Sequence, residues 1–168
     1  MDVYECLRSR RTVRKFSDRK VSDDVLDKIL NAARWAPSSR NQQPWELIVV
    51  TQKSTLREMG EIASTGSFIA DAPIAIAILM KNADQPGMDA GRALQQMEIM
   101  AWSEGLGTCF VTLTEGQKQR IANLLRIPEG ADLITVLPFG FRSDDFRGRG
   151  TPRKPLSGMV HREVFGNR

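Results

Sequence analysis

The apolar run from Ile74 to Met80 constrains the fold of this chain more than any other stretch. Its seven residues, IAIAILM, follow Pro73 and contain no polar side chain. A strand with one face in water alternates apolar and polar residues, and this run does not. We therefore expect a strand that is buried on both faces. The run is far shorter than the roughly 20 apolar residues of a membrane-spanning helix, so we do not expect this chain to be a membrane protein.

The length of 168 residues is enough to bury a core within one domain, and we expect a single domain over residues 1–168. Further strands are expected beside the first, which we place at residues 73–80. Apolar periodicity predicts strands over residues 46–51, 108–113 and 133–141, and helices over residues 2–9, 22–36, 54–63, 89–105 and 114–125.

Four of these helices have candidate N-caps, the residues whose side chains can accept a hydrogen bond from the first turn. Asp2, Ser22 and Ser54 each precede or open a helical pattern. Thr114 is followed three residues later by Gln117, which is the spacing of a capping box. Residues 142–168 show no such pattern, and a long tail of this kind is hard to place in its own domain. We expect it to lie across another subunit.

The net charge of +4 is unevenly distributed along the chain. Residues 1–20 and residues 142–168 each carry a net charge of +4, so the middle is acidic. Basic ends on an acidic body are more typical of a protein that holds an anionic ligand with both ends than of a protein that binds nucleic acid through a uniformly basic surface. Binding to nucleic acid or another anionic polymer stays open as a weaker alternative.

The inventory of reactive side chains is small. His161 is the only histidine, which disfavours zinc sites and Ser-His-Asp catalytic triads. Cys6 and Cys109 have no CxxC spacing, and no leader segment is recognisable, so we expect a reducing cytoplasm. Neither a Walker A sequence nor a dinucleotide-binding GxGxxG is present. An enzyme with this inventory would take its chemistry from a cofactor, with no catalytic side chain and no metal.

The most informative motif is Ser9–Phe16, SRRTVRKF. Its arginines alternate with residues that favour partial burial, and guanidinium groups bind phosphate with two hydrogen bonds. A second basic stretch lies at Arg147–Lys154. We predict that both stretches bind one anionic cofactor.

Four stretches, in this order, resemble the FMN-dependent nitroreductase family. They are SRRTVRKF at 9–16, APSSRNQQPWELIVV at 36–50, DAGRALQQMEIMAWSEGLGTC at 89–109 and LPFGF…TPRKPLSGMVH at 137–161. The resemblance implies an α+β sandwich with a mixed, mainly antiparallel four-stranded sheet flanked by helices. It also implies a homodimer in which the tail, about residues 142–168, adds a strand to the partner's sheet, and FMN bound where the two chains meet.

The resemblance also implies which residues contact the cofactor. It assigns the phosphate and ribityl chain to Arg10, Arg11 and Thr12 of the first basic motif, together with Arg153 and Lys154 of the tail. It assigns the pyrimidine edge of the flavin to Arg14. The loop that contacts the ring from the partner chain contains Pro37, Ser38, Ser39 and Asn41, and the strand end at one flavin face contains Phe110, Val111, Thr112 and Leu113.

The activity that the resemblance implies is hydride transfer from NADH or NADPH through flavin N5 to a nitroaromatic, a quinone or a similar electron-poor acceptor, by a ping-pong mechanism. Flavin destructase or reductive dehalogenase chemistry on the same fold is the alternative. The short stretch 81–88 replaces a longer excursion of larger relatives, and Thr112 stands where some relatives have an acidic residue. The acceptor, the choice between NADH and NADPH and the oxygen sensitivity stay open.

Overall fold

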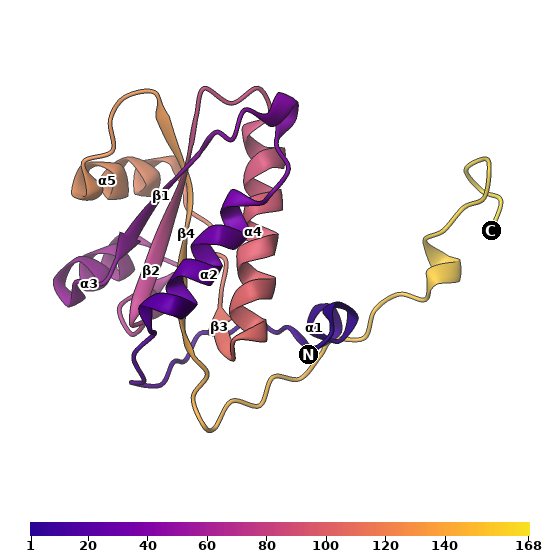
Figure 1. Cartoon of the computed structure of the whole chain (residues 1–168), viewed down its shortest axis with the longest axis horizontal. Coiled ribbons are helices and arrows are strands. Elements are labelled where there is room, and N and C mark those ends of the chain that lie inside the picture. The colour runs from indigo at the N-terminus through magenta and orange to yellow at the C-terminus, as the bar shows by residue number, and fades with distance from the viewer.

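The computed structural model of the chain describes all 168 residues. Its centre is a four-stranded sheet in the order β1-β2-β4-β3 (Figure 1). All neighbouring strands are antiparallel, and the parallel component that was expected is limited to one bridge between Thr12 and Thr108. The expected flanked four-stranded sheet is confirmed. The strands are β1 Trp45–Val50, β2 Ile74–Lys81, β3 Leu106–Thr108 and β4 Ala131–Phe141.

The chain has five α-helices, and four of them pack in two layers on the faces of the sheet (Figure 1). α2 and α4 cover one face, α3 and α5 cover the other, and α1 packs against α4 beyond the end of the sheet. The helices are α1 Val3–Ser9, α2 Asp23–Arg34, α3 Lys53–Ile62, α4 Pro86–Ser103 and α5 Glu115–Leu125. None of them combines the length and the apolar character that crossing a membrane would require.

β2 is buried on both faces, as its composition predicts. Every residue from Ile74 to Met80 is buried. The isoleucines and Met80 join the core beneath α2 and α4, whereas Ala75, Ala77 and Leu79 join the core beneath α3 and α5. An uninterrupted apolar strand is therefore the physical link between two hydrophobic cores.

The predicted N-caps are confirmed in part. The Asp2 carboxylate accepts a hydrogen bond from the Glu5 N–H at 2.8 Å. Thr114 and Gln117 form both bonds of the capping box at the start of α5. Ser22 occupies the N-cap position of α2 but makes no side-chain cap bond. The assignment of Ser54 is wrong, because α3 begins at Lys53 and its N-cap residue is Gln52.

The strand predicted over residues 108–113 is wrong in its extent. β3 ends at Thr108, which lies opposite Phe139 of β4. Continuing the ladder would place Cys109 opposite Pro138, which has no N–H to donate. The following residues stay beside β4 through a different contact, in which the Thr135 hydroxyl donates to the Val111 carbonyl at 2.7 Å.

The tail contains only one short turn of 3-10 helix, Leu156–Gly158. Its residues beyond Phe146 are exposed except for His161, and the segment runs away from the body of the molecule (Figure 1). The prediction that this stretch has little regular structure is confirmed.

Candidate functional site

A strongly basic hollow of about 790 Å³ lies between the end of α1 and the first part of the tail. Six arginines and no carboxylate line it, so it attracts anions. We call it the basic hollow. Its lining residues are Leu7, Arg8, Arg10, Arg11, Thr12, Phe146, Arg147, Gly148, Arg149, Gly150, Thr151 and Arg153.

The segment after α1 brings the two basic stretches together because it runs beside the edge of the sheet. The Val13 N–H donates to the Thr108 carbonyl at 2.9 Å, and the Val13 side chain is fully buried. Phe16 then forms a bridge with Arg142, at the start of the tail. Both stretches therefore reach one place within a single chain.

Arg10 forms an ion pair with a carboxylate of α4. Its Nη1 lies 3.9 Å from Oε2 of Glu98, whose side chain is 13% exposed. Burial raises the pKa of the Glu98 carboxyl, and the Arg10 charge lowers it to a smaller degree. At 3.9 Å this ion pair is too long for a hydrogen bond, so the donors of Arg10 remain available to an anion.

Arg11 joins α1 to the tail. Its Nη1 donates to the carbonyls of Arg8 at 2.7 Å and Arg10 at 2.9 Å. A Cβ at Gly150 would lie 2.5 Å from Nη2 of Arg11, so the guanidinium packs directly against the tail backbone. Its Nε is buried without a hydrogen-bond partner. An unpartnered guanidinium donor in a basic hollow fits a phosphate group.

Arg14 lies farther along the same segment, near residues 108–110. Its guanidinium lies 5.8 Å from the centre of the Phe68 ring. Burial raises the pKa of the Cys109 thiol, and the charge and hydrogen bond of Arg14 lower it. Phe110, next in the chain, is 49% exposed. These residues form an edge beside the basic hollow that combines a cation with an exposed aromatic ring.

The segment from Phe110 to Leu113 alternates between the surface and the core. Val111 and Leu113 are buried, whereas Phe110 and Thr112 are exposed. The Thr112 carbonyl accepts a hydrogen bond from the Thr65 hydroxyl at 3.2 Å. Val111 and Leu113 can therefore contact a ligand on this surface only through their backbone.

The loop with Pro37, Ser38, Ser39 and Asn41 lies away from the basic hollow. It sits at the start of α4, whereas α1 packs near the end of this helix (Figure 1). The 18 residues of α4 span roughly 27 Å. The structure thus does not bring this loop together with the arginines inside one chain. Lys154 also lies outside the lining of the hollow.

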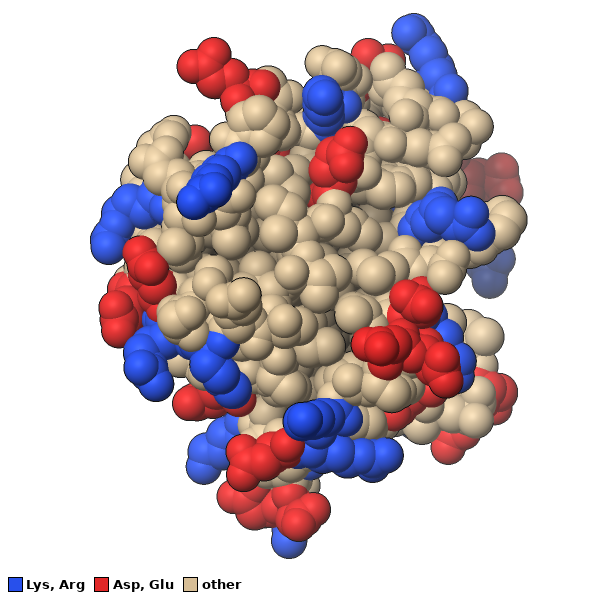
Figure 2. All heavy atoms as spheres, turned by 60° about the vertical axis from the view of Figure 1, so that its left-hand side comes forward, with Lys and Arg blue, Asp and Glu red and all other residues tan.

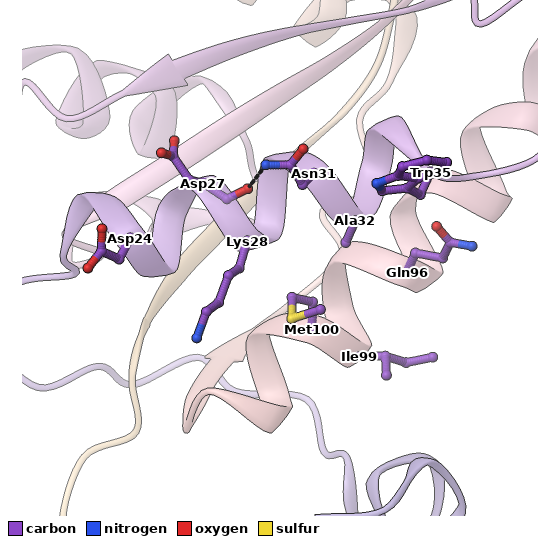
Figure 3. Close-up of a pocket in the computed structure, with 9 residues that line it drawn as sticks. All are labelled: Asp24, Asp27, Lys28, Asn31, Ala32, Trp35, Gln96, Ile99 and Met100. Carbon is purple, nitrogen blue, oxygen red and sulfur yellow. Dashed lines mark hydrogen bonds between the residues drawn. The ribbon is translucent and has the colours of Figure 1, made fainter.

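A second concave surface lies between α2 and α4, with a volume of about 760 Å³ (Figure 3). We call it the α2–α4 groove. α4 contributes Ile99 and Met100 to it, and α2 contributes a polar side as well as Ala32. Trp35, at the end of α2, is 74% exposed there. The groove lacks the cluster of cations that marks the basic hollow.

The surface over α3 and α5 has a different character. Figure 2 shows acidic and basic side chains interspersed around an uncharged centre on this side of the molecule. The arginines of the basic hollow are therefore a local concentration and not part of a uniformly basic surface.

Sequence reasoning missed several residues around these surfaces. Arg8 lies in the basic hollow although it precedes the motif Ser9–Phe16 and was not among the predicted site residues, and Arg147 and Arg149 were predicted only as part of a basic stretch. Glu98 and Asp89 gave no signal at all, because a carboxylate within a helix is usually solvated. Only packing shows that the side chain of Asp89 is fully buried.

Comparison with known proteins shows what the chain resembles. A sequence model of the Nitroreductase family matches residues 7–88 and 64–141. A protein of Methanothermobacter thermautotrophicus, named "Putative NADH dehydrogenase/NAD(P)H nitroreductase", is 34% identical over 86% of this chain and 80% of its own length. The Bacillus subtilis protein named FMN reductase (NAD(P)H) is 26% identical over 99% of this chain and 75% of its own length.

A solved structure agrees with these matches. The FMN-dependent nitroreductase from Clostridium difficile superimposes with a TM-score of 0.86 at 28% identity. The superposition covers 96% of this chain and 99% of that one.

Proposed function

The chain belongs to the Nitroreductase family and is an oxidoreductase that works with FMN and NAD(P)H, and on this premise we propose that its acceptor is a nitroaromatic, a quinone or a similar electron-poor compound. When bound, FMN would supply the hydride-transfer chemistry between NAD(P)H and the acceptor, and we propose that the two substrates react in turn by a ping-pong mechanism. The protein has to bind the cofactor, orient both substrates and tune the flavin.

The basic hollow carries this proposal. Arg10, Arg11 and Arg153 line it together, and we propose that they hold the FMN phosphate with Thr12 at their side. Lys154, the next residue, would reinforce the positive field from outside the lining. Six arginines without a carboxylate attract anions, and guanidinium groups bind phosphate with two hydrogen bonds.

Arg14 and the segment after Cys109 would hold the ring. A fixed cation favours a more negative flavin, so we propose that Arg14 lies at the pyrimidine edge, where charge gathers on reduction. Phe110 and Thr112 would face the flavin with their side chains. Val111 and Leu113 would contribute backbone only, since their side chains belong to the core.

We propose a homodimer, and the position of the remaining loop supports it. Pro37, Ser38, Ser39 and Asn41 lie about the length of α4 from the basic hollow. If they contact the flavin ring, they contact one bound to a second copy of the chain. The outer edge of β1 is unpaired in the sheet, and we propose that the tail of the partner pairs with it. We propose one domain per chain and a cytoplasmic location, which suits the two free buried cysteines.

The test is an absorbance spectrum of the purified protein, followed by anaerobic titration with NADH and with NADPH. We expect a yellow protein with one FMN per chain, bleached by at least one of the two coenzymes and reoxidised by added quinone or nitroaromatic. A protein that takes up no added FMN would contradict the proposed site. A flavin that is reduced but not reoxidised by either class of acceptor would contradict the proposed reaction.

A further inference from the structure

The loop from Ser38 to Gln43 has an unfavourable backbone. Arg40, Asn41 and Gln43 have φ angles of 49°, 56° and 50°, the left-handed region, although none of them is glycine. Such conformations persist only where the surrounding structure enforces them, and they concentrate at functional sites. Some part of the molecule must therefore hold this loop in place.

The carboxylate of Asp89 lies beneath the loop and binds it. The Ser39 N–H donates to Oδ1 at 3.1 Å and to Oδ2 at 3.3 Å. The Asp89 side chain is fully buried, and its one ion pair is with Arg92, at 3.5 Å. A buried carboxylate is stable only with partners, and here one of its partners is the loop backbone. The first turn of α4, where Asp89 lies, adds the favourable end of the helix dipole.

Two further hydrogen bonds stabilise the loop, and two of its polar side chains remain free. The Ser38 hydroxyl accepts a hydrogen bond from the Gln43 N–H at 2.9 Å, and the side-chain carbonyl of Gln42 accepts one from the Asp84 N–H at 3.1 Å. The hydroxyl of Ser39 and the side-chain amide of Asn41 have no hydrogen-bond partner within the chain. These two groups are held by the loop and are available to a ligand.

We propose that Asp89 is a positioning residue, which fixes the loop so that the Ser39 hydroxyl and the Asn41 amide meet the flavin ring bound to a second copy of the chain. This inference rests on the proposed function. Asp89 itself does not touch the flavin. It acts through the Ser39 N–H and the strained backbone that follows.

Ser39→Pro and Ser39→Ala together isolate the contact. Both variants lose the hydroxyl, but only proline loses the N–H. Ser38 has φ −129° and ψ 160°, the conformation that a residue before proline prefers, and proline suits the first position of a helical turn. We expect Ser39→Pro to bind FMN roughly tenfold more weakly than Ser39→Ala, because it loses a hydrogen bond to a charged acceptor.

Asp89→Asn tests the same contact from the other side, with Asp84→Asn as its control. Asp84 also pairs with the loop, through Arg40 at 3.4 Å, but its side chain is 42% exposed. We expect Asp89→Asn to weaken FMN and riboflavin by the same factor, about tenfold, and to change the visible circular dichroism of bound flavin. Asp84→Asn should leave the two affinities and the circular dichroism unchanged. Arg153→Gln should weaken FMN but not riboflavin, because only FMN carries the phosphate.

Three results distinguish the possibilities. Wild-type affinity and an unchanged flavin spectrum in Asp89→Asn, together with equal affinities for Ser39→Pro and Ser39→Ala, would overturn the inference. If Asp89→Asn does not fold, the two Ser39 variants decide alone, since they leave the core of α4 intact. A wild-type protein that binds no flavin would instead overturn the proposed function.

Discussion

At the scale of single residues, Glu98 makes the stability of the protein depend on pH. Burial raises the pKa of its carboxyl above the ordinary value of 4.5, and Arg10 opposes this shift only in part. The folded protein therefore holds this proton more tightly than the unfolded chain does. The stability from this group is complete below pH 4.5 and is lost as the pH rises through the folded-state pKa.

Glu98→Gln removes this ionisation. Without flavin, we expect the free energy of unfolding of the wild type to fall relative to Glu98→Gln as the pH rises from below 4.5 through the folded-state pKa of Glu98. Urea denaturation across this range measures the difference. Glu58→Gln, an exposed position on α3, should show no such trend. A wild type that gains stability over Glu98→Gln with rising pH would mean that the Arg10 ion pair outweighs burial.

Gly107 allows the first basic motif to lie against β3. A Cβ at this position would lie 2.3 Å from a methyl carbon of Val13, which is fully buried. We expect Gly107→Ala to lower stability by about 1–3 kcal/mol and to weaken FMN binding, because the segment from Arg10 to Arg14 must move. Thermal denaturation and flavin titration measure both effects.

Gly116 provides the control for this substitution. It lies in the first turn of α5, and a Cβ there would meet no atom within 4 Å. Gly116→Ala should leave flavin binding unchanged and raise stability by up to about 1 kcal/mol, since alanine favours the helix. Equal losses in the two variants would show that crowding against Val13 is not the cause.

At the scale of elements, the two predicted N-cap residues Thr114 and Ser22 differ in what they do. Both stand directly before a helix, but only Thr114 makes a side-chain cap bond. We expect Thr114→Ala to cost about 1 kcal/mol and Ser22→Ala a few tenths at most. Chemical denaturation of both variants tests this, and a comparable cost for Ser22→Ala would contradict it. Sequence alone predicted an N-cap at both positions and a capping box only at Thr114, and whether a cap bond forms depends on a rotamer that neighbours decide.

The long helix α4 shows the same division between local pattern and packing. Its existence was predictable from apolar periodicity, although it begins at Pro86 and not at Asp89. What sequence could not show is that its two ends serve different sites. Asp89 at one end anchors a loop, whereas Glu98, farther along, faces Arg10. These roles depend on segments that are distant in the chain.

At the scale of the whole molecule, the tail is the part that the single chain does not bury. Five large apolar side chains within it are exposed: Leu156, Met159, Val160, Val164 and Phe165. Exposed apolar groups at this density are typical of a surface that another chain covers. The groove between α2 and α4 also exposes Trp35, so each chain has apolar surface available for a second copy.

Removing residues 155–168 tests this assembly, because it leaves every residue of the basic hollow in place. We expect the full chain to sediment as a dimer with bound FMN, and the truncated chain to shift towards monomer and to lose most of its flavin. The loss follows because the second copy would no longer bring its loop to the ring. A truncated monomer that still binds FMN with full affinity would show that one chain suffices.

The sequence by itself determined the buried strand, the capping box of α5 and the order of the basic and loop motifs, because each depends on chemistry within a few neighbouring residues. The sequence also predicted that the two basic stretches share one site, but only the tertiary structure decided that they meet within a single chain, that residues after Thr108 leave the strand ladder, and that the loop around Ser39 lies at the far end of α4. These features arise from packing between segments that are far apart in the chain. Side-chain burial and proximity of this kind are properties of the folded molecule, and no local pattern encodes them.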